Sequence, residues 1–398
     1  MRSGASRLSV VPYTSALSQP HPGHPAVIAP APASPPVLPV PARRGRSAPI
    51  WIIGILVLLL VGLAAYLLTF LGAAASVIGM VLALVPFVGV LFAVRLVDRW
   101  EPEPRSLVLL AVAWGGIAAV VISLGVDLLI TLVIGNDRSP VREAFSSVVQ
   151  APVVEEVAKG LGLLLLFAIG RRAFDGPVDG IVYGALVGAG FAFTENILYF
   201  ASSLIEGGLA GTTVTFFVRG ILSPFAHVMF TVITGYALGR AARNGSSVGA
   251  ALGPWGLGLL GAIVLHAFWN GSALFADFFA LYATLQMPLF VLFVIGVLLL
   301  RREESRLTRV RLGEYAAAGW FTAGEVDMLA TGAGRRRAMT WARSLPGGAG
   351  AMRAFIADAT ALAAARQRAL SGRDPHAAED ERVFLARAVA ARAALFSR

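Results

Sequence analysis

The first three quarters of the chain alternate long apolar runs with short polar connections. About eight runs between Ile50 and Leu300 reach the roughly 20 residues that a helix needs to cross the hydrocarbon core of a bilayer. The third, fifth and seventh are long enough for tilted helices. The pattern therefore predicts an all-α, polytopic transmembrane helical bundle of about eight spans, near residues 50–70, 73–96, 106–134, 151–170, 178–204, 221–239, 248–274 and 282–300.

Two regions of different composition flank this bundle. Residues 1–48 are rich in Pro, Ala and Ser, which cannot bury enough apolar surface to order the backbone, so we expect a disordered cytoplasmic tail. Within residues 301–398, Met352–Leu370 and Ala377–Phe396 have the pattern of amphipathic, alanine-rich helices with basic faces. These helices could pack together, bind a partner or lie on the anionic inner leaflet. We expect three parts: the tail, a transmembrane domain at 49–300 and a soluble helical C-terminal region.

Composition supports this division. The 398 residues are 57% hydrophobic and 14% charged, whereas a soluble domain is about 45–50% apolar and about 25% charged. The net charge of +10 comes mainly from arginines in short connections and tails, where topology and membrane lipids account for it without nucleic acid. The absence of cysteine excludes disulfides and thiolate metal sites. No short apolar core with a cleavage site begins the chain, so we expect no removable signal peptide.

The arginines are unevenly divided between the two sets of connections. If the N-terminus is inside, the outer connections hold only Arg138, Arg142 and Arg219. By the positive-inside rule, this predicts a multi-pass protein of the cell membrane with both termini cytoplasmic. The inner connections and the inner C-terminal flank carry Arg95, Arg99, Arg105, Arg171, Arg172, Arg240, Arg243, Arg301, Arg302, Arg306 and Arg309.

Ionisable residues open the fourth apolar run. Glu155, Glu156 and Lys159 lie where a charge costs roughly 2.5–3.5 kcal/mol on membrane-insertion scales, so their presence indicates a function. Pairing of Glu155 with Lys159 one helical turn later is the structural alternative, and it leaves Glu156 without a partner.

Three other ionisable residues fall at a similar depth in other spans. At a rise of about 1.5 Å per residue, Glu156, Glu195, His227 and His266 all lie roughly 8–14 Å below the outer surface. Two carboxylates and two imidazoles at one level suit hydrolysis. They could bind a divalent metal that activates water, or a glutamate could act as general base beside polarising histidines. A single buried histidine is more often a hydrogen-bonding link between helices.

The neighbouring residues refine this constellation. Gly184–Gly190 gives the fifth run a small-residue face for close helix packing, just before Glu195. Asn270 follows His266 by one turn and could orient it or bind a substrate carbonyl. Asp127 lies at a similar depth, and we expect it to be a partner for Lys159 or Arg219 rather than a catalyst. The tail residues His21, His24 and His376 have no expected role, and the absence of an HExxH motif excludes a soluble-type zincin.

Taken in order, the motifs resemble those of the PrsW family of intramembrane proteases over about residues 50–300. The motifs are Asp98-Arg-Trp-Glu-Pro-Glu-Pro104, Glu155-Glu-Val-Ala-Lys159, Gly190-Phe-Ala-Phe-Thr-Glu-Asn196, His227 and His266-Ala-Phe-Trp-Asn270. That family is similar to the CAAX prenyl proteases and bacteriocin-processing enzymes, which share double-glutamate, Phe-x-x-x-His and His-x-x-x-Asn helices. The first and last motifs match. The middle motif departs, because the fourth residue after Phe191 is Glu195 and not histidine.

The resemblance implies an intramembrane endopeptidase that hydrolyses a membrane-associated protein such as an anti-sigma factor. In this hypothesis Glu155 or Glu156 is the general base. His227 and His266 hold a divalent metal, expected to be zinc, or polarise the scissile carbonyl, with Glu195 as third ligand or orienting group. A metal-free glutamate mechanism remains an alternative.

Supporting roles fall to Asn270, Lys159 and Asn196. Asn270 would stabilise the oxyanion or position His266, and Lys159 would keep the paired glutamates ionised. Asn196, beside Glu195, would support the site. Two other classes of function stay open, a proton-coupled transporter and a non-catalytic scaffold. A transporter predicts inverted repeats, which the sequence does not show, and a scaffold would tolerate loss of Glu156 or His266.

Overall fold

A computed structural model describes residues 47–98, 103–135, 139–171, 173–275 and 277–396. Predictions for residues 1–46, including His21 and His24, lie outside the described residues. The same holds for residues 99–102, which include Arg99 and part of its motif, and for Arg138 and Arg172.

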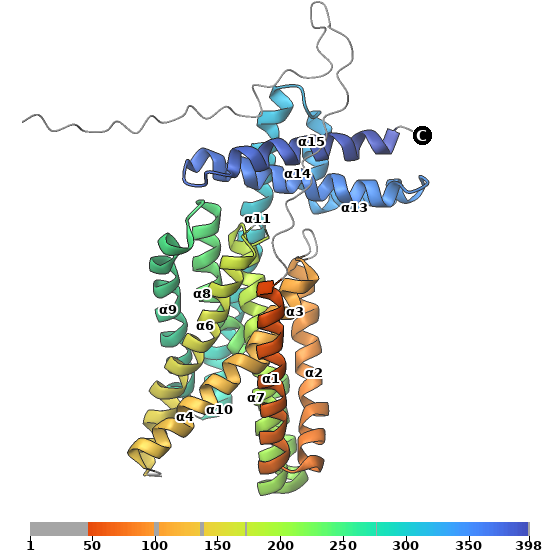
Figure 1. Cartoon of the computed structure of the whole chain (residues 1–398). Helices are drawn as coiled ribbons and strands as arrows, with labels where there is room; N and C mark the ends of the chain where they lie inside the picture. Colours follow the sequence, from red (N-terminus) through yellow and green to blue (C-terminus); the bar gives the residue numbers. More distant parts are fainter. Residues whose placement is uncertain (1–46, 99–102, 136–138, 172, 276, 397–398) are drawn as a thin grey trace, which may run out of the picture. The chain divides into compact units, whose positions relative to one another are not determined.

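Every regular element of the described residues is helical (Figure 1). Contacts divide the chain into a membrane unit ending at Glu304 and a C-terminal unit beginning at Ser305. Short π-helical turns, labelled η, interrupt some of the helices. The membrane unit contains α1 (Ser47–Phe70), α2 (Ala73–Val97), α3 (Arg105–Ala113), η3 (Trp114–Ala119), α4 (Val120–Ile134), α5 (Pro140–Phe145), η4 (Ser146–Gln150), α6 (Ala151–Ile169), α7 (Pro177–Phe216), η5 (Phe217–Leu222), α8 (Ala226–Arg243), α9 (Val248–Phe275), α10 (Phe278–Leu281), η6 (Tyr282–Gln286) and most of α11 (Met287–Ala317).

The chain is a polytopic helical membrane protein. Six helical stretches are long and apolar enough to cross a membrane: Trp51–Phe70, Ala73–Val97, Arg105–Ile134, Pro177–Arg243, Val248–Ser272 and Phe279–Ala317. The fourth stretch, of 67 residues, contains both α7 and α8, and the 19-residue α6 falls outside the set. Helices occupy all eight predicted runs, while the number of membrane crossings stays a prediction.

Helix α7 is the centre of the membrane unit. It contacts α2, α3, η3, α6 and α8, and α8 in turn packs on α9 (Figure 1). Close approach of α7 and α8 depends on glycine, because a Cβ at Gly188 would lie 2.6 Å from the carbonyl oxygen of His227. A Cβ at Gly184 would lie 2.9 Å from Cα of Val232. The predicted small-residue face is thus confirmed, and it brings the start of α8 against α7 beside Glu195.

The C-terminal unit has a hydrophobic core of its own. After the end of α11 it contains α12 (Ala323–Ala330), α13 (Gly332–Arg343), α14 (Gly348–Ser371) and α15 (Ala377–Phe396). Phe355 and Leu362 of α14 pack with Leu385 of α15 in that core. Of the three roles left open for these helices, packing together is therefore observed.

Candidate active site

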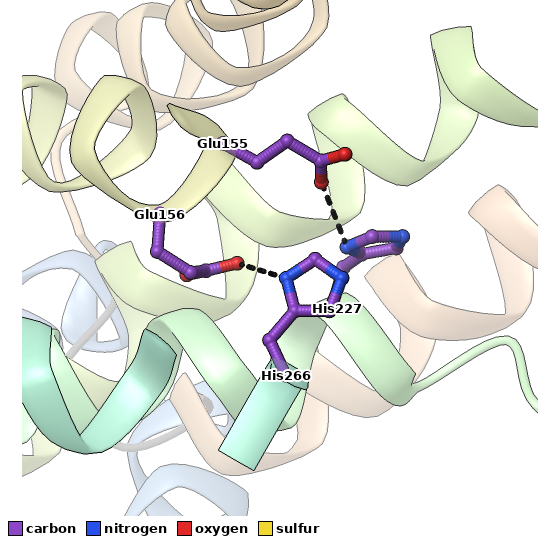
Figure 2. A group of neighbouring side chains, drawn as sticks. All are labelled: Glu155, Glu156, His227 and His266. Atoms are coloured by element: carbon purple, nitrogen blue, oxygen red, sulfur yellow. Dashed lines mark hydrogen bonds and ion pairs between the residues drawn. The ribbon is translucent and has the colours of Figure 1, made fainter. Parts of the chain in front are cut away.

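Four buried side chains converge from three helices of the membrane unit. Glu155 and Glu156 come from α6, His227 from α8 and His266 from α9 (Figure 2). One potential metal-ligand atom from each residue lies within 4.8 Å of those from the other three. Residues up to 111 positions apart in the sequence thus form one cluster.

Lys159 connects the two carboxylates on α6. Its side chain is fully buried, and its Nζ lies 3.1 Å from Oε2 of Glu155 and 2.8 Å from Oε1 of Glu156. Helical spacings of four and three residues place both carboxylates on the same side as the amine. The expectation that Glu156 lacks a partner is therefore wrong, because an ammonium group has three donors and serves both acids.

The same ammonium group determines the proton position on His227. Lys159 Nζ lies 3.1 Å from Nδ1 of His227. Since an ammonium nitrogen can only donate, Nδ1 must accept, and the ring proton belongs on Nε2. There it donates to Oε2 of Glu195 at 2.7 Å. Glu195 therefore orients the imidazole ring.

Glu195 is itself held by a cation. Arg219, on η5, forms an ion pair with Glu195, and its Nε donates to Oδ1 of Asn196 at 3.0 Å. The guanidinium group also lies over the ring of Tyr199, 3.8 Å from its centroid. A continuous polar chain thus runs from Lys159 through His227 and Glu195 to Arg219.

The surroundings of Glu156 differ from those of Glu155. Oε1 of Glu156 lies 3.2 Å from Nδ1 of His266, and its Oε2 accepts from the hydroxyl of Thr231 at 3.2 Å. The ring of His266 stacks on Phe230, with centroids 4.5 Å apart. Both carboxylate oxygens of Glu156 thus have partners, and only 1% of the residue is exposed.

Two cavities meet beside Glu155. One, of about 630 Å³, lies among α4, α6 and α7, and the other, of about 360 Å³, lies among α6, α7, α8 and α9. Glu155, Glu195 and Tyr199 line both, whereas Glu156 lines neither. Both volumes fall within the roughly 300–1,000 Å³ of ligand pockets. Glu155 is therefore the glutamate of the pair that faces space for water and substrate.

Two predicted residues have other partners than expected. Asp127 accepts from Nε2 of Gln150 at 3.0 Å, so its predicted pairing with Lys159 or Arg219 is wrong. Those two cations already bind the glutamates of α6 and α7. Asn270 lines the smaller cavity, and its Nδ2 donates to the carbonyl oxygen of Ser147 at 2.9 Å.

Known proteins match the part of the chain that forms this site. Residues 103–298 match the family model described as PrsW family intramembrane metalloprotease. The membrane unit is thus similar to the PrsW family. Curated relatives named "Protease PrsW" are 35% identical in Geobacillus kaustophilus and 31% in Bacillus subtilis, over 39% of this chain. A third, from Clostridioides difficile, is 30% identical over 42% of this chain.

The chain spans 63%, 65% and 66% of the lengths of these three PrsW proteins, slightly less than two thirds. No solved structure matches the chain. The family match includes every residue of the site described above.

The donor set fits the metal that the PrsW family description implies. Carboxylate oxygens and imidazole nitrogens are ligands that zinc accepts, and three protein ligands with an open fourth position are typical of catalytic zinc. Among the described residues, the group that could hold a metal contains Glu155 and Glu156 with the two histidines. The predicted set of Glu195, His227 and His266 differs from it, because Glu195 contacts Nε2 of His227 and Arg219 instead.

Sequence reasoning missed Arg219 and Thr231 as residues of the site. Arg219 was considered as a charge in an outer connection and as a partner for Asp127, although it lies only eight residues before His227. Thr231 follows His227 by four residues, so helical periodicity alone places it on the same face of α8.

Proposed function

We propose that this protein is an intramembrane endopeptidase that hydrolyses a peptide bond of a membrane-associated protein. The observation that carries the proposal is the buried Glu/His cluster that opens to a cavity through Glu155. Peptide hydrolysis within a bilayer needs a polar pocket that holds water, because the lipid supplies none. An anti-sigma factor as the class of substrate rests on the family resemblance alone.

Glu155 is the proposed general base. Its carboxylate takes a proton from water in the cavity while the water oxygen attacks the scissile carbonyl carbon. The protonated Glu155 then gives that proton to the leaving amide nitrogen as the carbon–nitrogen bond breaks. Asn270 faces the same cavity and has a second N–H beyond the one that Ser147 accepts, so it is suited to stabilise the oxyanion.

The remaining residues hold the reacting groups. Glu156, His227 and His266 would bind the metal, which we propose to be zinc, and Glu195 would orient His227 from behind. When bound, a divalent ion supplies Lewis acidity that polarises the carbonyl and lowers the pKa of water. Burial of Glu156 away from both cavities supports a binding role for it rather than a role as base.

A cleavage assay tests the proposal. Full-length protein in detergent is incubated with a quenched library of membrane-segment peptides. We expect Glu155→Gln to lower the rate by about 10²–10⁴-fold, the usual contribution of a general base. Glu303→Gln is the control, since Glu303 forms an exposed pair with Arg243 away from the site. If a chelator abolishes cleavage and added zinc restores it, the result supports a requirement for bound metal. Cleavage indifferent to chelator favours the metal-free mechanism.

Equal background cleavage by folded wild type and Glu155→Gln would contradict the protease proposal. That result would instead support the transporter or scaffold function, which the family match does not favour. We also infer that both termini face the cytoplasm, because the arginines concentrate in the connections and flank assigned to that side.

A further inference from the structure

Lys159 is the one lysine of the 398-residue chain. Every other basic side chain apart from histidine is arginine, including the cation that neutralises Glu195. The two side chains are not interchangeable. Arginine presents a planar fork, whereas lysine presents a compact charge with three donors. The one lysine side chain of the sequence therefore lies in the Glu/His cluster.

The ammonium group contacts two of the three proposed metal ligands, Glu156 and His227. Its three donors match three acceptors: Oε2 of Glu155, Oε1 of Glu156 and Nδ1 of His227. The Nζ–acceptor distances are 2.8–3.1 Å, and Lys159 is fully buried. The ring of Phe191 covers the ammonium group, with its centroid 3.8 Å from Nζ. Lys159 thus satisfies the cluster in the way that a bound cation would.

A divalent ion needs the same space. Zinc binds nitrogen and carboxylate oxygen at about 2.0–2.2 Å. An ion at that distance from both Glu156 and His227 would overlap the ammonium group, which already lies within about 3 Å of both ligand atoms. Two like charges at such a separation in a buried site also repel strongly. The ammonium group and the ion therefore exclude one another.

We propose that Lys159 is a built-in competitor for the metal site, and that a divalent ion enters only when the Lys159 ammonium group leaves the cluster. The flexible side chain can retain Glu155 as its partner while releasing Glu156 and His227, since Glu155 faces the cavities. Lys159 thereby sets the affinity of the site for metal. This inference rests on the metal ligands of the proposed function, but its tests measure binding and not cleavage.

Zinc affinity provides the first test. Full-length protein without a histidine tag is stripped with chelator in detergent and titrated with zinc by equilibrium dialysis. Lys159→Met keeps the length of the side chain and removes its charge. We expect this variant to bind zinc about tenfold more tightly or better, the scale on which neighbouring groups tune metal affinity. The gain in zinc affinity should disappear in the double variant Lys159→Met/Glu156→Gln. This variant keeps the tail histidines, so its loss of affinity would show that they do not hold the zinc.

The wild-type protein provides the second test, which does not depend on a variant that folds. Protein labelled with [ε-¹³C]lysine has one lysine resonance, because the chain has one lysine. We expect this resonance to shift in proportion to the zinc bound at the site. Three results would overturn the inference: equal or weaker zinc binding by folded Lys159→Met, stoichiometric zinc binding with an unchanged resonance, or no zinc binding by either protein. Cleavage by the same preparations reports separately on the protease proposal.

Discussion

Adjacent glutamates on α6 have different surroundings at the scale of single residues. Glu156 has a partner on each oxygen and almost no exposure, whereas Glu155 shares the amine of Lys159 and lines both cavities. One helical position changes the direction of a side chain by about 100°, because a turn takes 3.6 residues. Adjacent acids can therefore take the roles of base and ligand without any difference in chemistry.

Glu195 is expected to act through His227. Replacement by glutamine removes the charge that orients the ring and leaves Arg219 without its anionic partner. We predict that Glu195→Gln lowers zinc affinity or cleavage by about 10–100-fold, as loss of a group behind a metal ligand usually does. Equilibrium dialysis and the peptide assay measure the two effects. Glu303→Gln is again the control, since Glu303 pairs with Arg243 and lines neither cavity. Unchanged zinc affinity and unchanged cleavage would contradict the orienting role.

At the scale of elements, the contact between α7 and α8 positions His227. A methyl group at Gly188 would meet the backbone carbonyl of His227 at 2.6 Å, and the backbone cannot give way without moving α8. Glycine there thus serves the site as well as the fold.

We predict that Gly188→Ala destabilises the protein by about 1–3 kcal/mol, the usual cost of overpacking, and reduces cleavage by displacing His227. Thermal unfolding in detergent and the peptide assay measure these effects. Gly125→Ala on α4 is the control, because a Cβ there meets nothing within 4 Å. A stable and active Gly188→Ala would show that α7 and α8 can separate without loss.

A second link between elements joins the α2–α3 connection to α7. Glu103 is buried and accepts a hydrogen bond from the hydroxyl of Tyr183 at 2.5 Å. It lies between the candidate spans that end at Val97 and begin at Arg105. Burial raises the pKa of Glu103 to about 8, and the charges of Asp98 and Asp175 add to this. Burial likewise raises the pKa of Asp98 to about 6.

Stability should therefore fall as pH rises. The folded state holds the proton of Glu103 more tightly than the unfolded state, whose pKa is near 4.5. The protonated Glu103 contributes fully to the free energy of unfolding below about pH 4.5. As the pH rises towards 8 this contribution is lost, at up to about 1.4 kcal/mol per pH unit. Thermal unfolding between pH 5 and 9 measures it, and Glu103→Gln should flatten the profile. Identical profiles for wild type and Glu103→Gln would contradict the assignment.

The whole molecule combines a membrane unit that contains the complete site with a C-terminal unit that has its own core. The chain has no cysteine, so a single introduced thiol reports where a segment lies relative to the membrane. Ala354 on α14 and Val141 on α5 are both exposed and suited to such labelling.

We predict that an impermeant maleimide labels Val141→Cys but not Ala354→Cys in right-side-out vesicles, because the arginine distribution predicts a cytoplasmic C-terminal unit. Detergent should expose both thiols equally, which controls for reactivity. Labelling of Ala354→Cys from outside would contradict a cytoplasmic C-terminus.

The sequence by itself determined the helical membrane architecture, the resemblance to the PrsW family and the four residues that form the Glu/His cluster. These follow from local quantities: the length of apolar runs, the cost of a charge in lipid, and the depth of a residue along its span. The small-residue face of α7 was also predictable, because its glycines are visible in the sequence.

Only the tertiary structure decided how the charges pair. It joined Lys159 to both glutamates of α6 and to His227, Glu195 to Arg219, and Asp127 to Gln150. Depth along a helix can be counted from sequence, but pairing depends on how each helix is rotated about its axis and which neighbour it contacts. That rotation results from packing over the whole bundle, and it places the single lysine against Glu156 and His227, two of the three proposed metal ligands.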